Sequence, residues 1–257
     1  MHAGMNITLT KPLILRYFLL SLILSLPFFL FLFLPLLSPP HQHHRHATIT
    51  TITTTTYNNN LRIRPGYSSY DAYIQRQLNK TLNPRLRKIW NTRDWNRKIP
   101  VFARFFEDLK GKKLLHKGSK ALCVGARVGQ EVEALRRVGV SDSVGMDLVP
   151  YPPLVVQGDF HDQPFRNGTF DFEFSNVFDH ALYPERFVAE IERTLKPNGV
   201  CVLHVVLSRR ADKYSATDLY SVEPLAALFK RSVLVHVRGV NGFGLDTEVA
   251  FRKNTPP

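Results

Sequence analysis

The chain has 257 residues, only two cysteines, and a formal net charge of +13 at pH 7. This length allows one medium-sized domain with extensions, and it supplies ample apolar material for a core. Because Cys123 and Cys201 each lie inside an apolar run, they predict buried thiols and exclude a disulfide framework. No pair or cluster has the spacing of a zinc site, so no metal is expected.

The positive charge is confined to the N-terminal part of the chain. Residues 38–118 contain 16 Lys and Arg against 4 Asp and Glu, whereas residues 119–257 contain 16 against 17. A nucleic-acid enzyme more often carries positive charge across its folded domain. The distribution therefore argues against a nucleic-acid partner.

Residues 17–37, YFLLSLILSLPFFLFLFLPLL, form a run of 21 residues without a charge. As a helix this run would be about 31 Å long, close to the roughly 30 Å hydrocarbon core of a bilayer. It continues without the small-residue pattern of a cleavage site. We therefore expect an uncleaved, single-pass transmembrane anchor after an N-terminal flank of residues 1–16.

The charges that flank the anchor give its expected orientation. Lys11 and Arg16 precede it, and only Arg45 follows within about twenty residues, which favours a cytosolic N-terminus. The main domain would then lie in the lumen of the endoplasmic reticulum or Golgi, although the basic segment further along favours the opposite orientation. Glycosylation sequons at Asn79 and Asn167 would be used only in the lumenal case.

Residues 38–66 are a low-complexity stretch rich in Thr, His and Asn. Their apolar content is too low for an independent fold, so they predict a flexible linker. The histidines at positions 41, 43, 44 and 46 could bind a metal, but a solvated linker is the preferred interpretation.

Residues 67–118 form a basic segment with helical periodicity, interrupted at Asn83-Pro84. We expect these helices to pack against the main domain, because aromatic stripes at helical spacing are usually core; the alternative is a membrane surface. Two apolar stripes carry this expectation: Tyr70, Tyr73, Ile74 and Leu78, then Val101, Phe102, Phe105, Phe106 and Leu109.

Residues 119–253 alternate between strand and helix signals, which predicts a mostly parallel sheet with helices on both faces. Seven strands are expected, at ALCVG, SVGMD, PLVVQGD, FDFEFSNV, GVCVLHVVLS, RSVLVHVRGV and TEVAFRK. Helices are expected at residues 130–138, at PERFVAEIERTLKP and at VEPLAALFK.

Glycines and polar residues gather where the first four strands end. In such sheets a ligand binds at the carboxyl ends of the strands, beside the first one. Asp147 lies 22 residues after Gly125, a distance that suits a carboxylate on ribose hydroxyls. The remaining residues at these ends are Gly129, then Gly158-Asp159-Phe160, then Ser175-Asn176-Val177.

These segments resemble the class I S-adenosylmethionine-dependent methyltransferases, and most closely the type 11 group in its plant-type membrane-anchored form. The resemblance covers about residues 120–253 and rests on VGARVGQEV, VGMDLVP, QGDFHDQPF, FDFEFSNVFDH and PERFVAEIERTLKPNGV. It implies a Rossmann-like α/β fold with a seven-stranded sheet whose last strand is antiparallel. It also implies S-adenosylmethionine as the cofactor and methyl transfer to an acceptor that the sequence does not identify.

The resemblance further implies which residues hold this cofactor. Backbone near the first strand would approach the methionine part, a carboxylate would bind the ribose, and the next two loops would enclose the adenine. The residues are Gly125, Ala126 and Gly129 at the methionine, Asp147 at the ribose, Leu148 over the adenine, Asp159 at the adenine amino group, Phe160 beside the ring, and Asn176 near the transferred methyl.

Two positions depart from this family's pattern. Cys123 stands where an acid usually holds the amino group of the methionine, and Arg127 replaces a glycine. Glu131 could replace the missing acid, and Arg127 must either point elsewhere or pair with the methionine carboxylate.

A hydroxyl or amine acceptor would need a base within hydrogen-bond reach. Asp179 and His180, just past the fourth strand, are the catalytic candidates, with loop capping as the alternative role. His204 lies inside the fifth strand and is expected to be a core histidine.

Other functions remain open. Cys123 and Arg127 motivate a catalytically inert, membrane-anchored binding module. An anchored glycosyltransferase would usually need an Asp-x-Asp metal pair, and Asp171-Phe172-Glu173 is the nearest match. A nicotinamide enzyme is disfavoured, because Arg127 and Gln130 occupy glycine positions of its phosphate loop.

Overall fold

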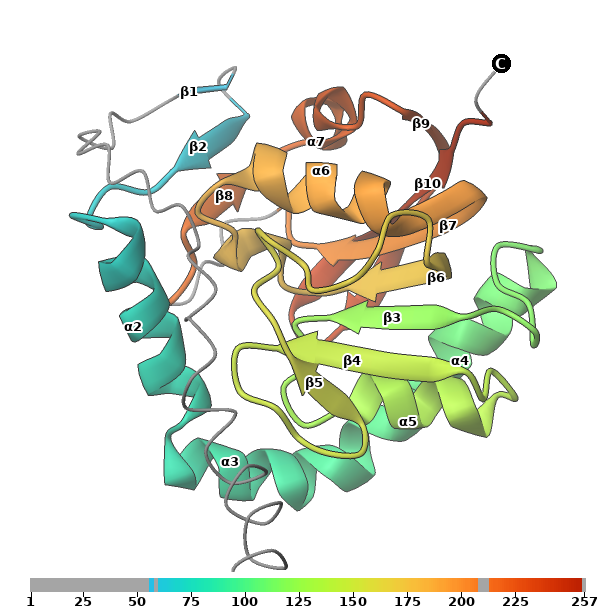
Figure 1. The fold of residues 1–257 in the computed structure, drawn as a ribbon, viewed down its shortest axis with the longest axis horizontal. Helices are drawn as coiled ribbons and strands as arrows, with labels where there is room; N and C mark the ends of the chain where they lie inside the picture. The colour runs from blue at the N-terminus through green and yellow to red at the C-terminus, as the bar shows by residue number, and fades with distance from the viewer. Residues whose placement is uncertain (1–55, 58–59, 208–212, 256–257) are drawn as a thin grey trace, which may run out of the picture. The chain divides into compact units, whose positions relative to one another are not determined.

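The computed structural model describes residues 56–57, 60–207 and 213–255 (Figure 1). The predicted anchor at residues 17–37 and the linker histidines lie outside these residues. Within the part of the chain that is described, no helix is both long and apolar enough to cross a membrane.

The described residues form one compact unit around a seven-stranded sheet. The strand order is β5-β4-β3-β6-β7-β10-β9, and β10 runs antiparallel to both of its neighbours while the first five strands are parallel. The predicted mostly parallel sheet of seven strands is therefore confirmed. Its strands are β3 (Ala121–Val124), β4 (Ser143–Asp147), β5 (Val155–Gln157), β6 (Phe170–Ser175), β7 (Leu195–Val205), β9 (Ser232–Gly242) and β10 (Leu245–Lys253).

Helices cover both faces of the sheet because its central strands are apolar on both sides (Figure 1). All four residues of β3 are buried: Ala121 and Cys123 belong to one core cluster, and Leu122 and Val124 to the other. The first cluster includes α4 (Arg93–Gly111) and α5 (Gln130–Arg137), and the second includes α6 (Pro184–Thr194) and α7 (Val222–Leu228).

The predicted stem at residues 67–118 folds into three helices, and the last of them joins this core. On α4, Phe102 and Phe106 place their rings 5.9 and 5.2 Å from that of Phe174 on β6. Packing against the sheet, the preferred expectation for this stripe, is thus confirmed for α4. The other two helices are α2 (Tyr70–Thr81) and α3 (Pro84–Asn91).

Helix α3 begins where the sequence predicts an interruption. The side chain of Asn83 accepts hydrogen bonds from the backbone N–H groups of Arg85 and Leu86, at 3.0 and 3.2 Å. Pro84 occupies the first helical position, where a missing N–H costs nothing. The chain therefore turns at this point and continues as a helix.

A small second sheet involves residues that the sequence assigns to the flexible linker. It pairs β1 (Thr56–Tyr57), β2 (Leu61–Ile63) and β8 (Thr217–Leu219) antiparallel. Leu61 is fully buried there, and Arg62 and Arg64 both form ion pairs with Asp218, at 2.9 and 2.8 Å. Composition could not predict this strand, because its partner lies more than 150 residues away in sequence.

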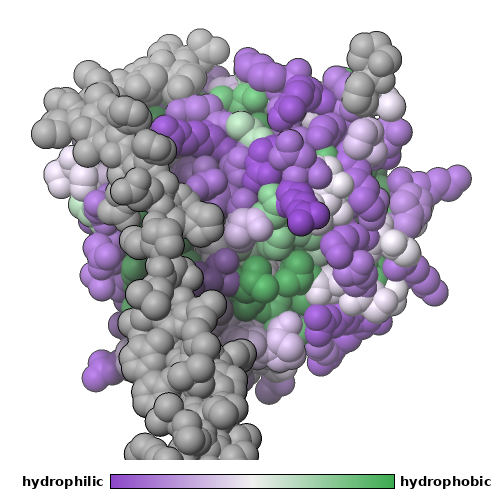
Figure 2. All heavy atoms as spheres, viewed as in Figure 1, coloured by the Kyte–Doolittle hydropathy of each residue, from purple (hydrophilic) through white to green (hydrophobic). Residues whose placement is uncertain are grey.

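Exposed apolar side chains of the described residues lie mainly on the two edge strands of the large sheet. Val156 on β5 is 40% exposed, and Val233 and Val237 on β9 are 51% and 46% exposed. Figure 2 shows one face that is mostly hydrophilic, with a hydrophobic area near its centre, where Figure 1 places β4 and β5.

Glu173 is a buried carboxyl group in the middle of β6. Its Oε1 accepts a hydrogen bond from the Thr194 hydroxyl at 2.6 Å, and its Oε2 has no partner among the described residues. Asp171 lies near the start of the strand and pairs with Lys196 at 2.9 Å. Neither acid lies at the carboxyl end of β6, so Asp171-Phe172-Glu173 does not form the metal pair of a glycosyltransferase. No group of three or more metal-ligating side chains occurs among the described residues.

Burial raises the pKa of Glu173 to about 8, from 4.5. Between these two pH values the folded protein keeps a proton that the unfolded chain has released, so the free energy of unfolding falls as the pH rises. The neutral variant Glu173→Gln should remove part of this fall in the free energy of unfolding. Each tenfold difference in proton affinity between the folded and unfolded states is worth about 1.4 kcal/mol. Urea unfolding at pH 5 and pH 8 measures the effect. The exposed control Glu185→Gln should keep the wild-type slope, and an equal change in both variants would contradict the assignment.

Candidate functional site

A cavity of about 420 Å³ lies at the carboxyl edge of the large sheet. This volume is typical of a small-molecule site. In Figure 1 the arrows of β3, β4 and β6 point toward the side of the sheet where α2 lies. Seven of the ten predicted site residues line the cavity: Gly125, Asp147, Leu148, Phe160, Asn176, Asp179 and His180.

Gly125 sits in the turn after β3, where no other residue fits. Its φ is +75°, and a Cβ there would lie 2.3 Å from Cγ2 of Val177. Its N–H donates a hydrogen bond to the Met146 carbonyl at 2.8 Å, so the turn is tied to the end of β4.

Ala126 and Gly129 shape the same turn without lining the cavity. Ala126 is buried, and Gly129 directly precedes α5 as its N-cap, with a φ of +85°. A Cβ on Gly129 would lie 2.7 Å from the Cβ of Leu154, so this glycine allows close packing behind the turn.

Asp147 ends β4, and it is half-buried in the cavity wall beside Leu148. Its Oδ2 accepts a hydrogen bond from the backbone N–H of Arg127 at 2.8 Å. Burial raises the pKa of the Asp147 carboxyl, and the hydrogen bond and charge of Arg127 oppose this effect in part. The carboxylate is thus held in place by backbone.

Arg127 turns its side chain toward the N-terminal helices. Its φ of +51° lies in the left-handed region, and its guanidinium carbon lies 5.4 Å from the centroid of the Trp90 ring. Gln130 strengthens this contact because its Nε2 donates to the Trp90 carbonyl at 2.8 Å. The Nε of Arg127 is buried and has no partner among the described residues.

Glu131 is a buried acid behind the cavity wall. It is 1% exposed, and its Oε1 accepts a hydrogen bond from Nδ2 of Asn176, a lining residue, at 3.0 Å. Its Oε2 has no partner among the described residues. Cys123 lies close by as a buried free thiol whose pKa is raised by burial, with a smaller effect from Glu131. An acid is therefore present near position 123, in the first turn of the following helix.

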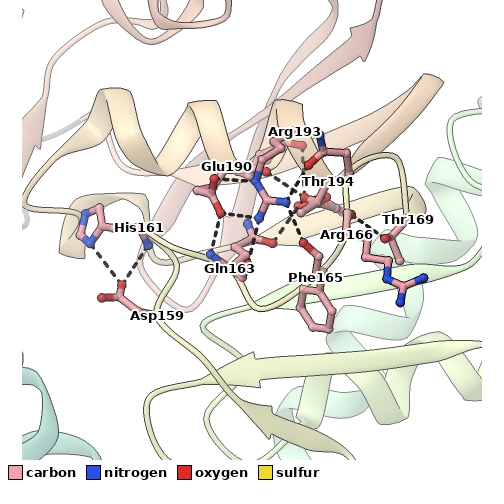
Figure 3. Close-up of polar contacts among 12 residues, drawn as sticks. Asp159, His161, Gln163, Phe165, Arg166, Thr169, Glu190, Arg193 and Thr194 are labelled. Atoms are coloured by element: carbon pink, nitrogen blue, oxygen red, sulfur yellow. Dashed lines mark hydrogen bonds and ion pairs between the residues drawn. The ribbon is translucent and has the colours of Figure 1, made fainter. Parts of the chain in front are cut away.

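Asp159 faces helix α2, although its neighbours Gly158 and Phe160 line the cavity. Its Oδ2 accepts from the Tyr70 hydroxyl. Its Oδ1 accepts from the His161 backbone N–H at 2.9 Å (Figure 3). Burial acts to raise the pKa of Asp159, but the hydrogen bonds from His161 and Tyr70 outweigh it and lower the pKa. The side chain predicted to meet an adenine amino group thus already has partners.

Arg193 clamps the loop after β5 onto α6 (Figure 3). Its guanidinium pairs with both carboxylate oxygens of Glu190 at 2.7 Å. It also donates to the carbonyls of Gln163 and Phe165 at 2.8 and 2.7 Å, and to Oδ1 of Asn167 at 3.0 Å. This network holds the loop that carries Gly158 and Phe160 into the cavity wall.

The two catalytic candidates, Asp179 and His180, line the cavity, and each forms a hydrogen bond with another side chain. Oδ2 of Asp179 accepts from the Ser215 hydroxyl at 2.5 Å. His180 has Nδ1 3.2 Å from the Tyr214 carbonyl and Nε2 3.2 Å from Nζ of Lys80. Because a carbonyl only accepts, Nδ1 of His180 carries the proton and Nε2 accepts from the lysine ammonium.

His204 lies in the core, as expected. It is 1% exposed, its Nε2 lies 2.9 Å from Oε2 of Glu248, and its ring packs edge-on against Phe105 and Phe174.

The rest of the cavity wall comes from outside the strand-end motifs. Helices α2 to α4 and the turn between β9 and β10 bring residues that no local spacing marks. Among these residues, the sequence marks only Phe102, as part of an aromatic stripe. That stripe predicts packing in the core and does not predict a place in a binding site. These lining residues include Gln77, Lys80, Thr81, Trp90, Lys98, Phe102, Phe243 and Leu245.

Residues 122–203 match a protein family described as a methyltransferase domain. The fold resembles the 1,6-didemethyltoxoflavin-N1-methyltransferase of Burkholderia thailandensis, solved with S-adenosylhomocysteine, at a TM-score of 0.56 and 16% identity; the match covers 79% of this chain and 99% of that one. A SAM-dependent methyltransferase from Aquifex aeolicus matches at a TM-score of 0.46 and 18% identity, over 57% and 88% of the two chains. No curated protein matches the sequence.

The Rossmann-like methyltransferase fold implied by the sequence is thus confirmed. Together, the matched domain and the fold support an S-adenosylmethionine-dependent methyltransferase, with S-adenosylmethionine as its cofactor.

The Arg193 clamp makes a prediction for stability. Arg193→Ala leaves two loop carbonyls without their arginine donor and leaves Glu190 with only the Gln163 N–H, so we expect the free energy of unfolding to fall by roughly 2 kcal/mol. Amide hydrogen exchange should also become faster in residues 163–167. Arg166→Ala removes an exposed arginine from the same loop, and its effect should stay within about 0.5 kcal/mol. Equal losses in urea unfolding would show that Arg193 is not a clamp.

Proposed function

We propose that this chain is an S-adenosylmethionine-dependent methyltransferase. The observation that carries the proposal is the cavity at the carboxyl ends of the parallel strands, with Asp147 and Gly125 in its wall. The cofactor would supply a methyl group on a positively charged sulfur, and the chain would bind and align it for in-line transfer.

The ribose and adenine would occupy the part of the cavity formed by β4 and β5. The Asp147 carboxylate is oriented by the Arg127 N–H and could accept from both ribose hydroxyls. Leu148 and Phe160 line the same region and would pack against the adenine. Asp159 already accepts a hydrogen bond from the Tyr70 hydroxyl. To bind the adenine amino group, its carboxylate would have to accept from both groups or release Tyr70.

The methionine end would lie beside Gly125 and Asn176. Two groups of opposite charge near this point each have one buried atom without a hydrogen-bond partner among the described residues, Nε of Arg127 and Oε2 of Glu131. Leaving a buried polar atom of a charged group unpaired is costly, and a zwitterionic amino acid would supply a partner for each. Glu131 would act through Asn176 or directly on the ammonium, and Arg127 would hold the carboxylate.

A thermal melt of the full-length chain tests cofactor binding. At about 100 times its dissociation constant, S-adenosylmethionine should stabilise the fold by roughly 2.7 kcal/mol. Asp147→Asn removes a charged acceptor, and we expect it to weaken binding about tenfold or more. The matched control is Asp142→Asn, an exposed acid before the same strand, which should bind as the wild type does. No shift at millimolar cofactor would remove the proposal.

The second candidate is a binding module that has lost its activity. The buried Cys123 in place of an acid and the left-handed Arg127 in place of a glycine favour it. Cofactor binding without transfer of a radiolabelled methyl group to any acceptor would support this candidate over the enzyme.

We also propose that residues 17–37 anchor the chain in the endoplasmic reticulum or Golgi membrane, with the domain in the lumen. Asn79 on α2 and Asn167 in the loop before β6 are both exposed, as glycan acceptors must be. In microsomes, the full-length chain should resist carbonate extraction and gain endoglycosidase-sensitive mass that is lost in the double variant Asn79→Gln, Asn167→Gln. Protease cleavage of the domain in intact microsomes, without any glycan, would contradict this topology.

A further inference from the structure

The cavity has a second half that the cofactor residues do not account for. Its wall comes from α3, α4 and the turn between β9 and β10, and it contains Trp90, Lys98, Phe102 and Phe243. If the cofactor occupies the strand-end half, this half is where the methyl acceptor would lie. Its chemistry therefore bears on the class of acceptor, and the inference rests on the proposed function.

Lys98 is a cation inside this half. The residue is only 8% exposed, and its Nζ lies 3.4 Å from Oδ2 of Asp94, a long contact for a charge-assisted bond. An ammonium has three donors, and Asp94 also accepts from Arg93 at 3.0 Å. Burial lowers the pKa of Lys98, and the charge of Arg127 lowers it further, while Glu131 and Asp94 oppose this. An anion placed beside Lys98 would relieve the cost of burying its charge.

Aromatic side chains surround this cation. The Nζ of Lys98 lies 5.1 Å from the centroid of the Phe243 ring, which in turn lies 5.6 Å from that of Phe102. Trp90 and Phe102 are 5% and 1% exposed, so the walls are fixed by packing. A rigid aromatic wall beside a buried cation suits a flat apolar body that carries a negative group.

The polar residues of the cavity favour an acceptor that is already ionised. Nε2 of His180 accepts a hydrogen bond from Lys80, and Oδ2 of Asp179 accepts one from Ser215, so each candidate base already interacts with a donor of this chain. A cationic amine would be repelled by Lys98 and Arg127. A carboxylate needs no base, because its pKa lies near 4.

We propose that the methyl acceptor is a small aromatic carboxylate, held by Lys98 against the wall that Phe102 and Phe243 form together. A carboxylate oxygen forms the new O–C bond as the C–S bond breaks, and the electron pair stays on sulfur. No proton is transferred, and the product is a methyl ester. Lys98 holds the acceptor before and during this step.

The test compares three classes of acceptor, using the full-length chain and S-adenosylmethionine with a labelled methyl group. The carboxylates are benzoate and cinnamate, the hydroxyl acceptor is phenol, and the amine is benzylamine. We expect an alkali-labile product from the two carboxylates only. Alkali-stable label from phenol or benzylamine, without ester, overturns the proposal. Where the melt shift shows cofactor binding but no ester forms, this inference fails and the proposed cofactor site stands; where the shift is absent, both fail.

Three lysine variants test the role of Lys98. Lys98→Met keeps the aliphatic stem and should raise the KM for benzoate about tenfold or more, with a smaller change in kcat. Lys98→Arg keeps the charge and should recover part of this loss. Lys112→Met is the matched control, because Lys112 also pairs with an aspartate four residues earlier on α4 but lies outside the cavity. All three should keep the cofactor-induced melt shift; an unchanged KM in a folded Lys98→Met overturns the assignment.

Discussion

The close approach of two strand ends fixes the geometry on which the site depends. Gly125 after β3 and Val177 after β6 are so near that a single Cβ would lie 2.3 Å from a valine methyl. These strands are neighbours at the point where the strand order reverses, and a crevice opens there in a parallel sheet. Backbone hydrogen bonds from Gly125 and Ala126 to Met146 extend the same constraint to β4. The wall that carries Asp147 is therefore set by backbone contacts.

The large sheet could be predicted because its signals are local. Apolar runs such as Ala121–Val124, bounded by glycines and charged residues, mark strands that are buried on both faces. Strand β2 could not be predicted, because Leu61 and Ile63 pair with Thr217–Leu219, which lies more than 150 residues away in sequence. The same limit applies to α4: its aromatic stripe predicts burial, but nothing in the sequence names the sheet face on which Phe102 packs.

The sequence predicts the part of the cavity wall that follows the strands β3, β4, β5 and β6. It does not predict the part that comes from helices α3 and α4. Asp147 and Asn176 follow strands at recognisable positions, and both reach the cavity. Trp90 and Lys98 reach it only because α3 and α4 fold back over the turn after β3, where the Trp90 carbonyl accepts from Gln130. The position of Asp159 after β5 can be predicted from the sequence. Its hydrogen bond to Tyr70 cannot, because it depends on how α2 packs against the domain.

Cys123 and Arg127, the two positions that differ from the pattern this sequence resembles, have a common physical explanation. An acid at position 123 would lie in the core beside Glu131, and two buried carboxylates so close would raise each other's pKa. With Cys123 there, the single carboxylate of Glu131 keeps its bond to Asn176. Arg127 adds a cation to the same turn, and its contact with the Trp90 ring is possible because α3 lies beside this turn. An aspartate at position 123 would therefore place a second buried carboxylate beside that of Glu131.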